Sequence, residues 1–260
     1  MLSKKDIDFD RTATDYARHR AGFPASFLEH LLDEGFLTDA AAVLDLGTGT
    51  GTVARGLARS GFDVTGVDPA PALLESARSL DKEAGVHVDY RLGTAEQTGL
   101  PSHAFDVVIA AQCWHWFEQE QALAEIERVV RPGSRLIIAF FDWLLDAGPV
   151  DEMRKLRRKH NPAWQSGSWP LGFYPQEPGD LSFANWRSQK SFLYVEDIPY
   201  THEAWRGRMR AYAGIGGSLP PAAVDAFDAE FADVLAQKFP DEPMMIPHKI
   251  WAEMWALEHQ

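Results

Sequence analysis

The stretch AAVLDLGTGTGTVARGLARSGFDVTGVDP, residues 41–69, decides the fold of this chain. Residues 41–46 form a short apolar run, which is typical of a buried parallel strand. Three alternate glycines, Gly47, Gly49 and Gly51, end that run. They predict a sharp turn whose backbone a ligand can approach closely, because glycine has no Cβ.

A second strand is predicted at residues 63–67, after a helix that follows the third glycine. The strand leads into Asp68, about twenty residues after the first glycine. Strand, glycine turn, helix, strand and acid in this order bring a carboxylate to the ribose hydroxyls of an adenosine-containing ligand. The stretch therefore predicts an adenosine site at the carboxyl edge of a parallel sheet.

Two adenosine cofactors fit a turn of this kind. From Gly49 the residues read GTGTVA, the form G-x-G-x-x-A, so a nicotinamide dinucleotide is one alternative. Asp45 argues against it, because dinucleotide sites usually have an apolar residue inside this strand. A buried carboxylate needs donors or a cation, and the amino group of S-adenosylmethionine and nearby loop N–H groups would both serve. A P-loop is excluded, since no Gly-Lys-Ser/Thr follows the glycines.

Five segments in order resemble the successive motifs of class I S-adenosylmethionine-dependent methyltransferases. They are VLDLGTGTG at residues 43–51, Asp68-Pro69, GTAE at 93–96, FDVV at 105–108 and VRPGS at 130–134, and their spacing matches the family over about residues 10–142. The resemblance implies a Rossmann-like α/β fold, in which a seven-stranded, mostly parallel sheet has an antiparallel last strand and helices on both faces. It also implies S-adenosylmethionine as cofactor and S-adenosylhomocysteine as product.

Composition limits the partners of the chain. Its 260 residues, 45% of them apolar, suit a single domain over residues 1–260. A net charge of −13 argues against nucleic acid and anionic membranes, and no segment is apolar enough to cross a membrane. Cys113 is the only cysteine, which excludes an internal disulfide and favours the cytoplasm. We expect a small-molecule partner and no metal; the sequence specifies no oligomeric state.

Periodicity predicts the remaining elements. Helices are expected at 10–36 with a break at 22–24, and at 72–80, 122–130, 150–160, 201–212 and 220–239; strands are expected at 86–92, 105–110, 135–141, 191–200 and 244–257. Arg131-Pro-Gly is expected to be a turn before the fifth strand. In the resembled fold the strand order reverses between the first and fourth strands, and ligands bind there.

The resemblance assigns cofactor contacts by position. On the sheet side they are Asp45, Gly47, Thr48, Gly49, Gly51, Asp68, Pro69, Ala95, Glu96, Ala111 and Gln112. The family commonly has Asp where this chain has Thr94, so a side-chain bond to the adenine amino group is not carried over, whereas a backbone contact from Ala95 is. The alternative for Glu96 is a carboxylate at the start of a helix.

Residues 1–40 are expected to form a helical leader that covers the cofactor. Tyr16 and Arg20, four residues apart, share a face of the predicted helix. In related methyltransferases a Tyr and an Arg in such a leader can meet the cofactor's carboxylate. The alternative is a surface tyrosine stacked on an arginine stem.

The segment AQCWHWF, residues 111–117, follows the fourth strand and is expected to line the crevice. His115, between Trp114 and Trp116, is the candidate catalytic residue, because an imidazole there can orient a carboxylate or accept a proton. The alternative is a histidine packed within an aromatic cluster. Cys113 is expected to pack as a small apolar group.

Residues 143–187 are rich in aromatic residues, proline and glycine, and are expected to form an insertion after the fifth strand that closes over the acceptor pocket. Trp143 and Trp169 are predicted to wall this pocket together with Trp114 and Trp116. The alternative is a small satellite core. The basic run at 154–160 is expected to be a solvated helix face.

The sulfonium methyl is already activated, so the protein must mainly hold the acceptor in line and exclude water. A carboxylate acceptor needs no general base, whereas a phenol or an amine must lose a proton. The WHWF segment and the aromatic insertion resemble the small-molecule branch that includes trans-aconitate methyltransferase. This resemblance implies O-methylation of a small acid or phenol; a nicotinamide-dependent oxidoreductase and a noncatalytic S-adenosylmethionine-binding protein are the alternatives.

Overall fold

The computed structural model describes residues 22–37, 41–145, 148–164 and 175–258. These residues form two compact units. The sheet unit comprises the described residues of 22–141, 175–194 and 250–258, and the helical unit comprises those of 142–164 and 195–249. The predicted division, one domain over 1–260 with a leader at 1–40 and a lid at 143–187, stays a prediction.

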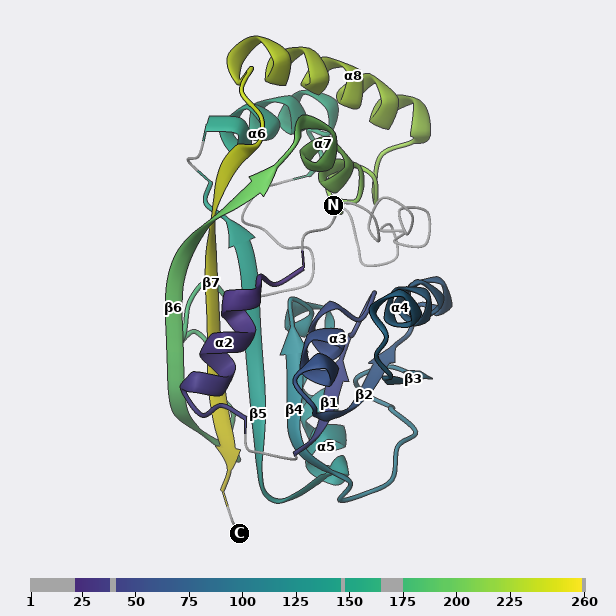
Figure 1. Cartoon of the computed structure of the whole chain (residues 1–260), viewed down its shortest axis with the longest axis vertical. Coiled ribbons are helices and arrows are strands. Elements are labelled where there is room, and N and C mark those ends of the chain that lie inside the picture. Colours follow the sequence, from purple (N-terminus) through teal and green to yellow (C-terminus); the bar gives the residue numbers. More distant parts are fainter. Residues whose placement is uncertain (1–21, 38–40, 146–147, 165–174, 259–260) are drawn as a thin grey trace. The chain divides into compact units, whose positions relative to one another are not determined.

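A seven-stranded sheet with the order β3-β2-β1-β4-β5-β7-β6 organises the described residues. Its strands are β1 (Ala42–Leu46), β2 (Asp63–Asp68), β3 (Asp89–Leu92), β4 (Phe105–Ala111), β5 (Val130–Trp143), β6 (Trp186–Tyr200) and β7 (Met244–Leu257). β1 pairs in parallel with β2 and with β4, and β4 pairs in parallel with β5. β7 runs against its neighbours (Figure 1). The predicted fold class, including the antiparallel last strand and the reversal of order between β1 and β4, is confirmed.

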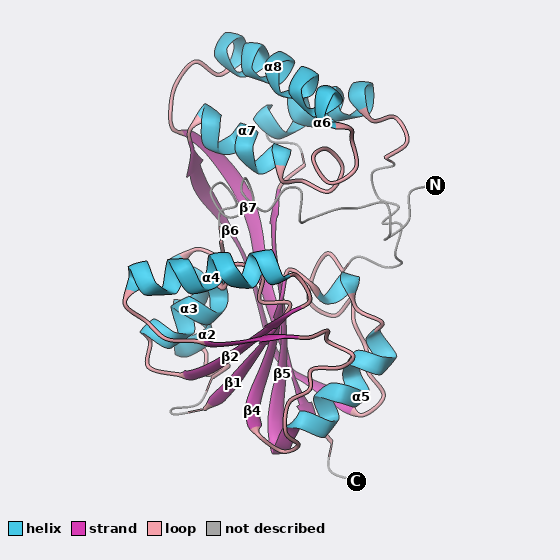
Figure 2. Cartoon of the chain, turned by 90° about the vertical axis from the view of Figure 1, so that its right-hand side faces the viewer, coloured by secondary structure: helices cyan, strands magenta, loops and turns pink. Residues whose placement is uncertain are grey.

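Helices cover both faces of the sheet unit. The helices are α2 (Ala25–Asp33), α3 (Thr52–Arg59), α4 (Pro71–Ala84) and α5 (Gln119–Val129). Figure 2 shows α2, α3 and α4 on one face of the sheet and α5 on the other. The apolar residues of α3, such as Val53 and Leu57, are buried, as the period of 3.6 residues requires.

Asp106 explains why the start of β1 is fixed beside β4. Its carboxylate accepts a hydrogen bond from the Ala42 N–H at 2.8 Å and another from the Arg131 guanidinium at 2.7 Å. One side chain on β4 thus joins the first residue of β1 to the second residue of β5.

The prediction of a turn at Arg131-Pro-Gly is wrong, because β5 already begins at Val130. The reason is an irregularity in the pairing: Phe105 pairs with Val130, but Val107 pairs with Arg135. The residues between Val130 and Arg135 therefore bulge out of the ladder within the strand, and Gly133 supplies the positive φ of 79° that the bulge needs. The other predicted elements in the described residues are present, with ends shifted by a few residues.

The helical unit contains α6 (Gly148–His160), α7 (His202–Arg210) and α8 (Pro221–Lys238). Its core consists of buried side chains from these helices and from the adjoining ends of β6 and β7, with Trp205, Met209, Phe227, Phe231 and Ile246 at its centre. None of the described helices is long and apolar enough to span a bilayer.

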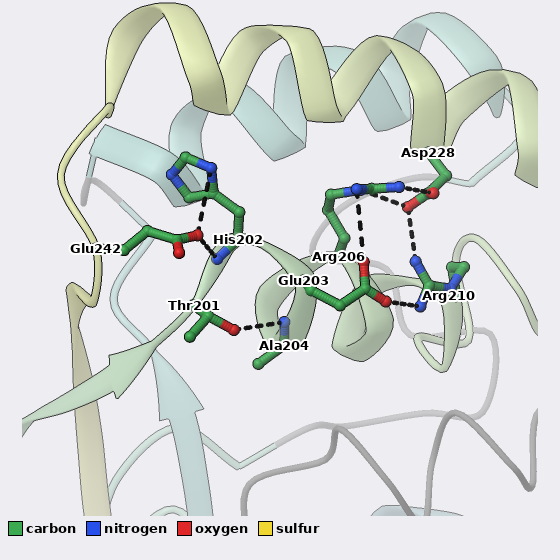
Figure 3. Close-up of polar contacts among 8 residues, drawn as sticks. All are labelled: Thr201, His202, Glu203, Ala204, Arg206, Arg210, Asp228 and Glu242. Carbon is green, nitrogen blue, oxygen red and sulfur yellow. Dashed lines mark hydrogen bonds and ion pairs between the residues drawn. The ribbon is translucent and has the colours of Figure 1, made fainter.

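Polar contacts fix α7 against α8 (Figure 3). The Asp228 carboxylate on α8 binds the guanidinium groups of Arg206 and Arg210, and Glu203 binds Arg210 at 2.8 Å. At the start of α7 the Thr201 hydroxyl accepts the Ala204 N–H at 3.1 Å and so caps the helix.

Replacing Thr201 by Ala is expected to lower the free energy of unfolding by about 1 kcal/mol, because the Ala204 N–H loses its acceptor. Thr201→Ser is the matched control, since it keeps the hydroxyl. Urea denaturation at pH 7 measures both. Equal losses in the two variants would contradict a capping role.

Candidate active site

The turn after β1 is tied to the end of β2. The Thr48 N–H donates to the Val67 carbonyl at 3.0 Å, and the Gly51 N–H donates to the Thr48 carbonyl at 2.9 Å. Gly47, Gly49 and Gly51 have φ values of 64°, 56° and 73°, in the left-handed region that favours glycine. The predicted glycine turn is therefore a compact, hydrogen-bonded structure that ends at the first residue of α3.

Close packing also requires glycine at two of these positions. A Cβ at Gly47 would lie 2.8 Å from the Cys113 Cβ, and a Cβ at Gly51 would lie 2.0 Å from the Tyr90 hydroxyl oxygen. The Cys113 thiol donates to the Leu46 carbonyl at 3.0 Å. Cys113 is thus a buried packing residue beneath the turn, as expected.

Asp68 closes the turn from the side of β2. One carboxylate oxygen accepts the Gly49 N–H at 2.9 Å, and the other accepts the Ala70 N–H at 2.9 Å. The side chain is buried, and Pro69, the next residue, is exposed. The carboxylate therefore lies between the glycine turn and the start of α4, at the carboxyl edge of the two strands.

Asp45 lies beneath the same turn and is 2% exposed. Its carboxylate accepts a hydrogen bond from the Thr48 hydroxyl at 2.7 Å. Burial raises the pKa of Asp45 to about 7, while the hydrogen bond from Thr48 opposes this shift and the charge of Asp68 adds to it. A cationic ligand group at the turn would stabilise the ionised form of Asp45.

The residues that support the turn from the side of α4 were not predicted from the sequence. Arg55 donates to the Thr50 carbonyl at 2.8 Å and to the Ala77 carbonyl at 3.2 Å, and it pairs with the buried Asp81 at 2.6 Å. Burial, and then the charge of Asp81, raise the pKa of Tyr90, which stays protonated. One signal was present: Asp81 continues the apolar stripe of α4 at a position where an apolar residue is the rule.

A side chain from the segment after β3 contacts the residue that precedes α5. The Glu96 carboxylate accepts the Glu118 N–H at 2.8 Å, at the first turn of α5, while Ala95 is buried. This is the helix-start arrangement named as the alternative for Glu96. Its contact with a cofactor, like that of Ala95, stays a prediction.

Gln112 joins the ends of two central strands. It follows Ala111, the last residue of β4, and has a φ of 62°, which is uncommon for a residue with a side chain. Its N–H donates to the Ala139 carbonyl at 2.8 Å, and its side-chain oxygen accepts the Phe141 N–H at 2.6 Å. Strained backbone held in this way is frequent at functional sites.

The aromatic segment behind Gln112 is packed against the sheet. Trp114 is fully buried, and its ring lies edge-on to Phe183 at 5.3 Å between centroids. His115 is 4% exposed, with its ring 5.6 Å from Phe140 and 5.2 Å from Trp116. His115 thus lies within an aromatic cluster, and its contact with an acceptor stays a prediction.

The remaining predicted site residues lie elsewhere. Trp143 belongs to the helical unit, where its ring meets Trp205 edge-on at 5.5 Å. Tyr16, Arg20 and Trp169 lie outside the described residues. The sheet unit therefore contains all the predicted site residues between positions 45 and 116.

Replacing Gly51 by Ala is expected to destabilise the protein by several times the roughly 1–2 kcal/mol of left-handed strain alone, because the new methyl group would overlap the Tyr90 hydroxyl. Gly85→Ala is the matched control: it has a φ of 68° and nothing within 4 Å of the added Cβ. Urea denaturation compares the two. The double variant with Tyr90→Phe should recover part of the loss, and no recovery would contradict the proposed overlap.

Asp45 gives a pH dependence whose sign follows from its raised pKa. Between pH 4 and pH 7 the unfolded chain has released this proton while the folded protein still holds it, so Asp45 makes the free energy of unfolding fall as pH rises. The slope is at most about 1.4 kcal/mol per pH unit. In Asp45→Asn this contribution is absent.

The difference in free energy of unfolding between the wild type and Asp45→Asn isolates the effect from other titrating groups. It should decrease from pH 4 to pH 7 and level off above pH 7, in urea denaturation of the ligand-free protein. A difference that is constant with pH would refute the raised pKa.

Comparisons with known proteins agree with this geometry. Residues 44–138 match the family model described as a methyltransferase domain. An uncharacterized methyltransferase of Schizosaccharomyces pombe is 32% identical over 228 residues, which cover 87% of this chain and 86% of the relative. The malonyl-[acyl-carrier protein] O-methyltransferase of Salmonella typhimurium is 30% identical over 219 residues, with 81% and 78% covered.

An uncharacterized methyltransferase of Mycobacterium tuberculosis is 37% identical over 157 residues, covering 57% of this chain. The match spans 61% of the mycobacterial protein's own length. Among solved structures, a putative type II methyltransferase from Anaeromyxobacter dehalogenans has a TM-score of 0.64 at 23% identity, over 92% of this chain and 99% of that one, which supports the fold. The chain therefore belongs to the class I S-adenosylmethionine-dependent methyltransferase family.

Proposed function

We propose that this chain transfers the methyl group of S-adenosylmethionine to an oxygen atom of a small-molecule acceptor. The observation that carries the proposal is the arrangement of Asp68, Gly49 and Asp45 at the carboxyl edge of β1 and β2. One carboxylate closes the glycine turn, and a second lies buried beneath it. Both belong to the order of elements that holds an adenosine ligand.

The chemistry of the two carboxylates fits this cofactor. Asp68 is an acceptor at the end of β2, where the ribose hydroxyls would donate. Asp45 titrates near neutral pH, so an ammonium group nearby would hold it ionised. Thr48, Ala95 and Ala111, which lie at or just after the carboxyl ends of β1, β3 and β4, would complete the contacts. When bound, the cofactor supplies a methyl group that is already activated on sulfur.

The residues of the chain then have to position the acceptor and exclude water. Gln112 fixes the end of β4 to the end of β5, and the 111–117 segment follows directly. Trp114, His115 and Trp116 would form the acceptor side of this segment. In this role His115 orients the acceptor oxygen, or takes its proton where the oxygen is protonated.

The names of two relatives, both O-methyltransferases, favour oxygen as the atom that is methylated. The Salmonella relative is named a malonyl-[acyl-carrier protein] O-methyltransferase. A ubiquinone biosynthesis O-methyltransferase of Azorhizobium caulinodans is 50% identical over 98 residues, 37% of this chain and 39% of that protein. One name refers to a malonyl group and the other to ubiquinone biosynthesis, so we propose a carboxylate or phenol acceptor, in keeping with the resemblance to the trans-aconitate methyltransferase branch.

Family membership favours methyl transfer over the nicotinamide alternative. A noncatalytic binder is distinguished by experiment: transfer of labelled methyl from S-adenosylmethionine to a panel of acids and phenols supports the proposal. Binding of S-adenosylmethionine without transfer to any member of the panel would favour the noncatalytic alternative.

Replacing Asp68 by Ala is expected to weaken S-adenosylmethionine binding by on the order of 100-fold, because hydrogen bonds to a charged partner are lost. Asp63→Ala, at the exposed start of the same strand, is the matched control and should bind normally. Isothermal titration calorimetry measures both, with thermal melting to verify folding. An unchanged affinity in Asp68→Ala would refute the assigned role.

A further inference from the structure

Arg55 holds two successive carbonyl groups of the glycine turn. Its N–H donates to the Gly51 carbonyl at 2.8 Å, and its guanidinium donates to the Thr50 carbonyl, also at 2.8 Å. A trans peptide group keeps its C=O and its N–H on opposite sides, so the bond to the Thr50 carbonyl also directs the Gly51 N–H. That N–H donates to the Thr48 carbonyl at 2.9 Å. One residue of α3 therefore sets the orientation of the peptide group between Thr50 and Gly51.

The guanidinium of Arg55 is itself fixed from α4. It pairs with Asp81 at 2.6 Å and donates to the Ala77 carbonyl at 3.2 Å. The pair is largely buried, with 12% of the Arg55 side chain and 6% of the Asp81 side chain exposed. The two helices lie on the same face of the sheet (Figure 2). The donor that binds the Thr50 carbonyl is thus held in place by a charge pair between α3 and α4.

The Tyr90 hydroxyl lies against the same part of the turn. A Cβ added to Gly51 would be 2.0 Å from this oxygen and 3.2 Å from the Arg55 guanidinium, so both groups flank Gly51 directly. Tyr90 is on β3 and is 5% exposed, and its carbonyl accepts a hydrogen bond from Arg78 at 2.9 Å. Burial, and then the charge of Asp81, raise the pKa of Tyr90, so its hydroxyl is neutral at pH 7. A cation and a neutral hydroxyl therefore limit the space around Gly51.

Stability alone does not explain a charge pair at this position. Taking two charges out of water often costs as much as their attraction returns, and apolar side chains of similar volume can stabilise a fold equally well or better. Leu74 and Ala77, which precede Asp81 on the same stripe of α4, are apolar and buried. An apolar pair could therefore join α3 to α4, but it could not donate to the Thr50 carbonyl.

We propose that Arg55, Asp81 and Tyr90 are positioning residues for the cofactor. Together they hold the peptide group between Thr50 and Gly51 in the orientation that S-adenosylmethionine needs in order to bind. Arg55 acts on this group directly, Asp81 holds the guanidinium, and the Tyr90 hydroxyl limits the movement of Gly51. The inference rests on the proposed function, and it requires cofactor affinity to depend on these residues separately from the stability of the fold.

The test separates affinity from stability with two variants that lack the same kinds of charge. The charge-free variant carries Arg55→Met and Asp81→Leu. The matched control carries Arg59→Met and Glu83→Leu, at exposed positions of the same two helices. Calorimetric titration with S-adenosylhomocysteine measures affinity, and thermal melting measures stability. Hydrogen exchange in the ligand-free protein measures the protection of the Gly51 amide.

Arg55→Met alone should melt at a lower temperature than the wild type, because it leaves Asp81 buried without its cation. The charge-free variant should regain most of this loss in melting temperature. It should still bind S-adenosylhomocysteine about tenfold more weakly than the wild type, and its Gly51 amide should exchange faster. Tyr90→Phe should weaken binding by several-fold. The matched control should equal the wild type in all three measurements.

Wild-type affinity in the charge-free variant would overturn this inference, because the pair would then act only through stability. If the charge-free variant does not fold, Arg55→Lys and Tyr90→Phe decide. Arg55→Lys keeps a positive charge beside Asp81 but lacks the fork of donors, so unchanged affinity in both variants refutes the assignment. Failure of S-adenosylhomocysteine to bind the wild type would overturn the proposed function as well, whereas loss of the predicted differences among folded variants overturns the positioning role alone.

Discussion

The hydrogen bond from the Gly49 N–H to the Asp68 carboxylate joins the turn after β1 to the end of β2. It is possible because the two strands are parallel neighbours in register, with Leu46 beside Val67. For the Gly49 N–H to reach the Asp68 carboxylate, the turn must adopt a left-handed backbone conformation, which its glycines allow. The rest of the candidate site, on β3, β4 and α5, follows from the order in which the sheet places its other strands beside this pair.

The glycine turn of the candidate site was predictable because its determinants are close together in the sequence. Apolar runs, alternate glycines and an acid within 41–69 specify strand, turn, helix and strand by local rules. The support behind the turn was not predictable, since Arg55 and Asp81 belong to separate helices and meet only after folding. The incorrect prediction of a turn at Arg131 has a similar cause. Pro and Gly next to each other locally indicate the end of an element, whereas pairing with β4 keeps the segment in a bulged strand.

The aromatic cluster of the helical unit is assembled differently. Its members Trp143, Tyr200 and His248 come from β5, β6 and β7, and the first and last of them are more than a hundred residues apart in the sequence. No local pattern in the sequence relates these residues, so the cluster could not be predicted from it.

The guanidinium of Arg55 holds the Thr50 carbonyl from behind, with Asp81 as its buried counter-ion. The amide groups of the turn are thus ordered in the ligand-free protein, so a ligand can bind without a loop having to fold first. Little conformational entropy is then lost on association. We expect differences in affinity among nucleoside ligands to lie mainly in how slowly they leave, since each meets the same preformed backbone.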